Sequence, residues 1–375
     1  MNNQGNKIKT ILIILISVVI TAHPFTYGNT DEVQNELMVR KPVDPVGFVR
    51  FDWQMEKFMK RIEEVQADQL QKALKKNNIN NETKWKVVIS PHDDHAYVGY
   101  LYPAVLKNLN AGTIILFGVA HKAKDLGLED RFIFDEYKSW HGPYGPVKVS
   151  GLRSELIRDL PMEVKEVNNR MHKIEHSIEA LIPFIQYYNR DVEIVPILVP
   201  YMSYKRMTFL GKKLADAITI AIKKRNWKWG KDFAIAISSD SVHYGDSDWG
   251  GKNFARFGSD KKGYENAIAL ESEIINKCLI GTITKNKIRT FTEYTVKKDN
   301  YKEYKWTWCG RYSIPAGLMT AYYLSEKLSV SLKGVKAGYR TSITLPPLEV
   351  KDLKIGFTAP ANLHHWVGYT AIGYK

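Results

Sequence analysis

Short apolar runs of strand length alternate along this chain with longer amphipathic stretches of helical length, and this alternation limits the folds available to it. The clearest apolar runs are rich in Val and Ile and are bounded by Pro, Gly or Asp: residues 85–90, 113–118, 192–199 and 233–238. Helices are expected at residues 54–76, 151–160, 175–188, 204–225, 262–278 and 312–328. Strands separated by helices in this way predict an α/β domain with a largely parallel central sheet.

One large domain is expected over residues 31–375, because the chain shows no internal repeat, long linker or low-complexity segment. Alternating strands at 333–345 and 367–374 are expected to close the same sheet. Of the 375 residues, 44% are hydrophobic and 25% are charged, which suits a chain with a sizeable core. Two cysteines, Cys278 and Cys309, are too few for a disulfide framework and too far apart for a CxxC motif.

Residues 1–28 are expected to direct export. Lys7 and Lys9 precede an apolar run at residues 11–22, which is shorter than the roughly 20 residues needed to span a bilayer. This arrangement resembles a secretory signal peptide, with an uncleaved N-terminal anchor as the alternative. We therefore expect a periplasmic or extracellular protein, either free or tethered through this segment.

The net charge is +14, from 54 Lys and Arg residues against 40 Asp and Glu residues. Such a surplus favours anionic partners, including an anionic membrane surface. The lysines are scattered as pairs, and no RRM, helix-turn-helix or zinc-finger pattern organises them. A solvated basic surface is therefore favoured over specific nucleic-acid binding.

Three of the ten histidines closely follow predicted strands: His92, His121 and His243. In an open α/β sheet, ligands bind outside the carboxyl ends of the strands, so these side chains are expected to converge. Neutral imidazole binds Zn, Fe and Cu, and Asp240 adds a carboxylate as a ligand, an orienting group or a base. The sequence thus predicts a metal site, with three unconnected loop histidines as the alternative.

A competing motif, His172-Lys173-Ile174-Glu175-His176, fits the H-x-x-E-H signature of inverted zinc peptidases. In that signature two histidines one helical turn apart bind zinc, and the glutamate is the general base. The motif is short enough to arise by chance and leaves the strand-end histidines unexplained, so it is a secondary hypothesis. Serine hydrolase and P-loop chemistry are disfavoured because no G-x-S-x-G elbow or G-x-x-x-x-G-K-[ST] loop is present.

Together these residues resemble the MEMO family, whose fold is related to that of the LigB-like class III extradiol dioxygenases. Five spaced motifs follow the family's order: Pro91-His92 with Tyr97 and Gly99; Gly118 to His121; Glu175-His176-Ser177-Ile178-Glu179 with Pro183; Ser238-Ser239-Asp240 with His243 and Gly245; and Cys309-Gly310-Arg311 with Ile314. Residues 40–47 are similar to a degraded form of the family's N-terminal segment. The resemblance implies a single-domain α/β/α sandwich with a metal pocket.

The resemblance also implies functional residues. By this match the metal ligands are His92, His121 and Cys309, and the catalytic pocket residues are Asp240, His243 and His176. Two histidines and a thiolate suit Fe(II) or Cu, with Zn as an alternative. A bound metal and the Arg311 cation are both expected to favour the Cys309 thiolate. The alternatives for Cys309 are a small buried residue or a disulfide with Cys278.

The expected function is metal-dependent, dioxygenase-like redox chemistry on an unknown small molecule. The alternative is a non-catalytic envelope module that binds a peptide or an anionic ligand. The loop after His92 departs from the family pattern, because Asp93-Asp94-His95 replaces a small residue, glycine and an aromatic residue, so Asp94 and His95 are candidate additional ligands. Family members are often encoded beside a radical-SAM enzyme, and no such partner is expected for an exported protein.

Overall fold

The four apolar runs lie at the centre of one sheet in the computed structural model, which describes residues 38–375. They form β2 (Val87–Ser90), β3 (Thr113–Val119), β8 (Glu193–Val199) and β9 (Phe233–Ser238). These strands are parallel and lie in the order β2-β9-β3-β8. All their residues except Glu193 are buried, as expected for strands covered on both faces.

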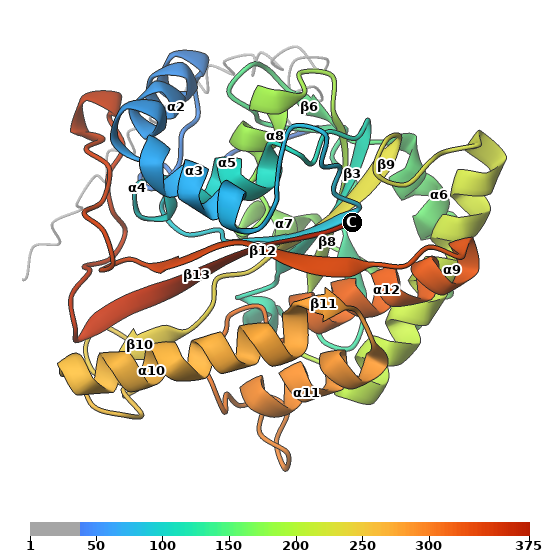
Figure 1. Ribbon diagram of the computed structural model, residues 1–375. Coiled ribbons are helices and arrows are strands. Elements are labelled where there is room, and N and C mark those ends of the chain that lie inside the picture. Colours follow the sequence, from blue (N-terminus) through green and yellow to red (C-terminus); the bar gives the residue numbers. More distant parts are fainter. Residues whose placement is uncertain (1–37) are drawn as a thin grey trace, which may run out of the picture. The chain divides into compact units, whose positions relative to one another are not determined.

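Further strands extend this parallel centre on both sides, so the ten-stranded sheet is mixed (Figure 1). The C-terminal strands pair antiparallel with each other and with β2, as predicted for the same sheet. The added strands are β4 (Phe132–Phe134), β7 (Lys165–Val167), β10 (His243–Gly245), β11 (Gly281–Thr282), β12 (Lys333–Thr341) and β13 (His365–Tyr374). A separate small sheet contains β1 (Val39–Arg40), β5 (Ser139–Trp140) and β6 (Val147–Lys148).

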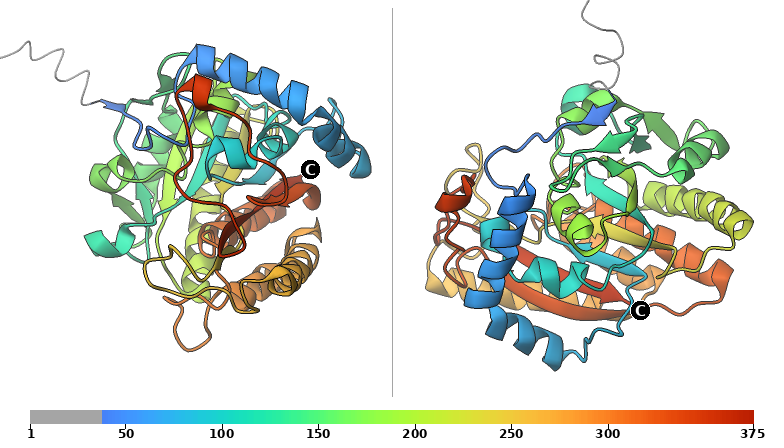
Figure 2. Two further views of the ribbon diagram at one scale, coloured as in Figure 1. Left: turned by 90° about the vertical axis from the view of Figure 1, so that its left-hand side faces the viewer. Right: turned by 90° about the horizontal axis from the view of Figure 1, so that it is seen from above.

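Helices cover both faces of the central sheet, which confirms the predicted α/β/α architecture (Figures 1 and 2). One layer contains α2 (Asp52–Val65), α3 (Ala67–Lys76), α4 (His95–Val98), α5 (Leu101–Leu106), α7 (Asn169–Lys173) and α8 (Ile182–Tyr188). The other contains α6 (Gly151–Asp159), α9 (Tyr204–Arg225), α10 (Lys261–Ile274), η2 (Ile275–Leu279), α11 (Lys285–Thr295) and α12 (Ser313–Leu328). Short helical turns occur at η1 (Ala123–Leu126) and η3 (Lys351–Leu353).

Two predictions concern the N-terminal region. The expected leader, residues 1–28, lies outside the described residues, and within residues 38–375 no helix is long and apolar enough to cross a membrane. The helix expected at 54–76 is divided at Gln66, which separates α2 from α3. The Gln66 Oε1 atom accepts the backbone N–H of Tyr100 at 2.9 Å. The residue at the break therefore makes a tertiary contact, which the hydrophobic pattern of residues 54–76 could not predict.

Gly373 lies in a tightly packed part of β13, so a substitution there tests the packing of the sheet. A Cβ atom added there would lie 2.3 Å from two atoms of the Trp85 indole, which is itself buried. We expect Gly373→Ala to lower the free energy of unfolding by about 1–3 kcal/mol through overpacking. Gly356→Ala is the control, because its added Cβ would have no neighbour nearer than 3.6 Å. Equal urea-denaturation midpoints for the two variants would contradict this expectation.

Candidate metal centre

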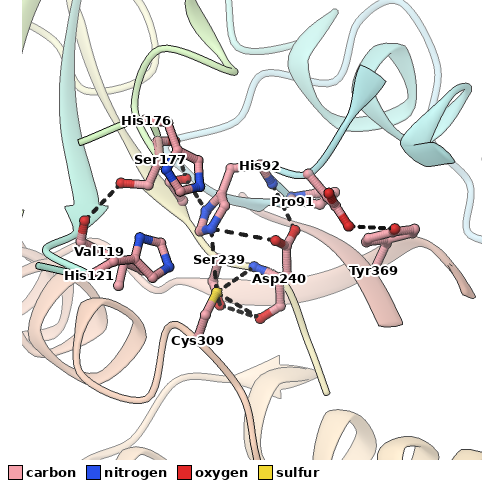
Figure 3. Close-up of polar contacts among 12 residues, drawn as sticks. Pro91, His92, Val119, His121, His176, Ser177, Ser239, Asp240, Cys309 and Tyr369 are labelled. Atoms are coloured by element: carbon pink, nitrogen blue, oxygen red, sulfur yellow. Dashed lines mark hydrogen bonds and ion pairs between the residues drawn. The ribbon is translucent and has the colours of Figure 1, made fainter. Parts of the chain in front are cut away.

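Three of the candidate ligands directly follow neighbouring strands of the sheet. Figure 3 shows them close together, beside Cys309 and His176. His92 comes two residues after the end of β2, Asp240 two residues after β9, and His121 two residues after β3. Because β9 lies between β2 and β3, the loops that follow these strands meet at one edge of the sheet. The structure thus brings these three side chains together.

His92 belongs to two groups of candidate ligand atoms, and the atoms within each group lie within 4.8 Å of one another. One group joins His92 to His121 and His176, and the other joins it to Asp240 and Cys309. The His92 Nε2 atom is 3.5 Å from Cys309 Sγ and 3.4 Å from Asp240 Oδ2. Two donors bound to one ion at about 2.1–2.3 Å have a similar separation. The implied ligands His92, His121 and Cys309 are therefore divided between two groups that share His92.

The His92 ring is held in one orientation. Its Nδ1 atom lies 2.7 Å from the hydroxyl of Ser238, and that hydroxyl donates to a main-chain carbonyl, so His92 Nδ1–H is the donor. This tautomer leaves the electron pair of Nε2 facing Cys309 and Asp240. Burial, followed by the neighbouring histidines, lowers the pKa of His92 well below its usual value. A neutral imidazole of this kind is the form that binds metals.

Glu175 orients the second histidine. Its carboxylate accepts the backbone N–H of His121 at 2.7 Å and lies 2.9 Å from His121 Nδ1. It also accepts the backbone N–H groups of His176 and Ser177, which holds these residues in a turn. The helix predicted to start at Glu175 therefore starts at Ile182. Burial acts to raise the Glu175 pKa, but His121 and the hydrogen bonds outweigh it, and the pKa is lowered. A carboxylate that fixes a ligating imidazole is a common feature of metal sites.

His176 lies beside both other histidines. Its ring stacks on His121 with centroids 4.9 Å apart and meets His92 edge-on at 5.7 Å. The side chain is 40% exposed, so it forms the outer part of the group. The structure therefore makes His176 a candidate ligand, in addition to the catalytic role expected from the sequence.

His172 points away from this site. Its Nε2 atom contacts the carbonyl oxygen of Ile133 at 3.0 Å, and its ring packs edge-on against Trp140. Helix α7 ends at Lys173, so His172 and His176 do not lie one turn apart on one helix. Among residues 38–375, the candidate ligand groups contain His176 without His172. The structure therefore lacks the arrangement that the H-x-x-E-H hypothesis requires.

The Cys309 thiol is buried against Asp240. Its Sγ atom accepts the backbone N–H of Asp240 at 3.1 Å. Burial, followed by the Asp240 charge, raises the pKa of the Cys309 thiol well above its usual value and outweighs the Arg311 cation. Arg311 does act to lower this pKa, as expected, but burial and Asp240 outweigh it, so a bound ion would have to displace the proton. Cys278 and Cys309 are both free, so the alternative disulfide is absent from the described chain.

Three aspartate side chains lie at or beside the candidate centre: Asp240, Asp93 and Asp94. Burial raises the pKa of Asp240 to about 7, and burial followed by the Asp240 charge raises that of Asp93 to about 7. Asp93 accepts the Tyr369 hydroxyl at 2.6 Å (Figure 3). Asp94 accepts hydrogen bonds from the backbone and hydroxyl of Thr358. The Asp94 carboxylate therefore links the loop after His92 to the loop that contains Thr358. Asp94 is not a member of either candidate ligand group in the described chain.

His95 and His243 also lie outside the two ligand groups of the described residues. His95 is a core residue, because Nδ1 accepts the backbone N–H of Val49 and Nε2 donates to the carbonyl of Ala180. His243 packs against Trp249, and its buried Nε2 has no hydrogen-bond partner in the described chain. The catalytic role expected for His243 stays a prediction.

A cleft of about 840 Å³ leads to His121 and Cys309. Its lining contains one acidic residue, Glu303, and five cationic residues: Lys124, Lys252, Lys297, Lys302 and Arg311. The Arg311 guanidinium lies over the rings of Tyr304 and Tyr312, and its buried Nε has no hydrogen-bond partner among the described residues. The approach to the candidate ligands is therefore cationic, a feature that the scattered lysines in the sequence did not reveal.

Glu271, behind the Cys309 loop, should make stability depend on pH. It accepts the indole N–H groups of Trp306 and Trp308 at 2.6 Å. Burial raises its pKa from 4.5 to about 7, so between these values the folded protein holds a proton that the unfolded chain has lost. Stability from this group therefore falls as pH rises through that window, by up to about 1.4 kcal/mol per pH unit. Glu271→Gln should remove this part of the slope in urea denaturation, and parallel slopes would contradict the expectation.

Comparison with known proteins finds similarity to members of one family. The profile of the Memo-like protein family matches residues 57–344. A MEMO1 family protein of Pyrococcus furiosus is 28% identical over 166 residues, which cover 42% of this chain and 52% of the relative. One from Pyrobaculum arsenaticum is 31% identical over 213 residues, covering 56% of this chain and 70% of the relative. The chain spans about half the length of the first curated relatives it matches.

Proposed function

This chain belongs to the Memo-like protein family, and on that premise we propose that it binds one transition-metal ion and carries out metal-dependent redox chemistry. The observation that supports this proposal is the buried His92 ring, whose Nε2 faces Cys309 Sγ and Asp240 Oδ2 at 3.5 and 3.4 Å. The set of neutral imidazoles, one thiol and one carboxyl suits Fe(II) or Cu, with Zn as an alternative.

The described residues would have distinct roles. In the thiolate group, His92 would hold the ion with Cys309 and Asp240. In the histidine group, His92 would hold it with His176 and with His121, which Glu175 orients. Asp240 binds the His92 backbone through Oδ1 and leaves Oδ2 facing the ligands, where it can act as a ligand or in proton transfer. An iron or copper ion bound there would supply one-electron chemistry.

Elemental analysis of the full chain, purified anaerobically without chelator, tests this function. We expect near-stoichiometric iron or copper in the wild type. Loss in Cys309→Ser would identify the thiolate group as the site, and loss in His176→Ala would identify the histidine group. His364→Ala is the control, because His364 is exposed and paired with Asp246 at 2.8 Å. Wild-type protein without metal, or equal metal in all variants, would contradict the proposal.

A second candidate function is non-catalytic binding of an anionic ligand in the same cleft. Lys297 and Lys302 of the lining are in ion pairs with glutamates, but Lys124, Lys252 and the unpartnered Nε of Arg311 favour it. Titration of inorganic phosphate and benzoate into wild type and Arg311→Gln would test it, with weaker binding expected in the variant. Equal binding, no binding, or turnover of a substrate that depends on His243 would contradict this candidate.

Export through residues 1–28 is also proposed, with the protein free or tethered outside the cytoplasm and without a radical-SAM partner. The basic start and the apolar run at residues 11–22 support it. Fractionation of cells that express the full chain is the test. Recovery in the cytoplasm with an intact N-terminus would contradict export.

A further inference from the structure

One side of β12 is an open sheet edge. The strand pairs with β13 along its length, with one irregularity between Lys336 and Gly338, whereas β11 pairs only with Lys333 and Gly334. On that side residues 335–341 have no strand partner within the described chain. At about 3.3 Å per residue this edge is about 20 Å long. The main chain of Thr341 is bonded to Thr344 in a turn, but the other main-chain groups that face this edge can pair with an added strand.

A groove of about 480 Å³ lies along this edge, between α3 and α10. Gly338 and Tyr339 both line it, although consecutive residues of a strand face opposite sides. A Cβ on Gly338 would meet Leu101 in one helical layer, whereas the Tyr339 hydroxyl lies 3.4 Å from Glu271 in the other. A groove that contacts both faces lies beyond the strand edge, and Figure 1 shows α3 and α10 on opposite faces of the sheet. The groove is therefore placed where an added strand would lie.

The two walls of the groove differ in charge. No acidic residue lines it, and none of its lysines has an ion-pair or hydrogen-bond partner within residues 38–375. The wall formed by α3 and β12 carries Lys72, Lys76 and Lys336, and the wall formed by α10 and η2 carries Ile268, Ser272 and Ile275. One wall is thus basic and the other is uncharged and largely apolar.

We propose that this groove binds an acidic extended peptide, which adds to the sheet as a strand beside β12. Because alternate side chains of a strand point to opposite faces, one set would meet the lysines and the other the isoleucines. The peptide should therefore alternate acidic and apolar residues. A second copy of this chain fits poorly, because pairing of two such edges would bring the unpaired lysines of both copies together. This site is separate from the proposed metal centre.

A fluorescein-labelled octapeptide of four Glu-Val repeats is the probe, used with the full chain in fluorescence anisotropy at low ionic strength. Lys72→Glu/Lys76→Glu should weaken binding by at least about ten-fold, and both positions are exposed, so the fold should be retained. Lys228→Glu/Lys231→Glu changes the net charge equally at exposed positions that do not line the groove and should alter binding by less than about two-fold. No binding to the wild type, or equal weakening by both variants, would overturn the proposal.

Two further measurements test whether the peptide binds as an added strand. The peptide should slow hydrogen exchange of those backbone amides of residues 335–341 that face the open edge, because added hydrogen bonds protect them. Alternate N–H groups of a strand point to the same edge, so N-methylation of the odd residues and of the even residues blocks opposite edges of the peptide. Only one of the two methylated peptides should bind. Equal binding of both, or unchanged exchange at 335–341, would overturn strand addition, and neither result depends on metal content.

Discussion

Replacement of Arg40 by methionine is expected to lower the free energy of unfolding by about 3–5 kcal/mol, because Glu179 would remain buried without its cation. The side chains of Arg40 and Glu179 are 2% and 7% exposed and form an ion pair. The Arg40 guanidinium also donates to the main-chain carbonyls of Glu175 and, at 3.1 Å, His172. A single substitution therefore leaves a charge and two acceptors without their donor.

Urea denaturation of matched variants tests this expectation. Arg40→Met/Glu179→Gln should recover part of the loss, because no unpaired charge stays buried. Arg131→Met breaks an exposed pair with Glu166 and should cost no more than about 1 kcal/mol. If Arg40→Met costs no more than Arg131→Met, the buried pair does not stabilise the fold as argued.

The segment that contains Arg40 has further contacts with Glu179. The Glu179 carboxylate accepts the backbone N–H groups of Val43 and Asp44, in addition to its pair with Arg40. This segment is thereby joined to the turn that begins at Glu175, whose carboxylate orients His121. Its role in the described structure is to support the candidate metal centre.

The central strands and the loops after them were predictable from sequence, because their signals are local. Val- and Ile-rich runs mark buried strands, and parallel order places the residues that follow them at one edge. This reasoning found His92, His121 and Asp240. Cys309 and His176 came only from their motifs, because neither follows a central strand directly.

The remaining differences between the predicted and the observed structure depend mainly on contacts between residues distant in sequence. Glu175 starts a turn rather than a helix because its carboxylate is engaged by His121, which is 54 positions away. His95 is a core residue because Val49 and Ala180 satisfy both ring nitrogens. Helix α11 was missed although its buried Ile288 and Phe291 have helical spacing, since polar residues dominate the stretch.

Removal of the His92 ring should have the largest effect on metal affinity. His92 is shared by both candidate ligand groups of the described chain, so its loss impairs either arrangement. We expect His92→Ala to weaken metal binding by more than about 100-fold, since loss of even a supporting partner typically costs about 10–100-fold. Titration of the metal-free full chain with Fe(II) or Cu measures this change.

Ser238→Ala tests the orientation of the His92 ring separately from its role as a ligand. It leaves the His92 ring in place but removes the hydroxyl 2.7 Å from Nδ1, so Nε2 is no longer held as the acceptor. The expected loss of affinity is about 10–100-fold, which lies between wild type and His92→Ala. His364→Ala should bind as wild type does. If His92→Ala kept its affinity while Cys309→Ser or His176→Ala lost it, the ion would be held without the residue on which both groups converge, and the proposed centre would be wrong.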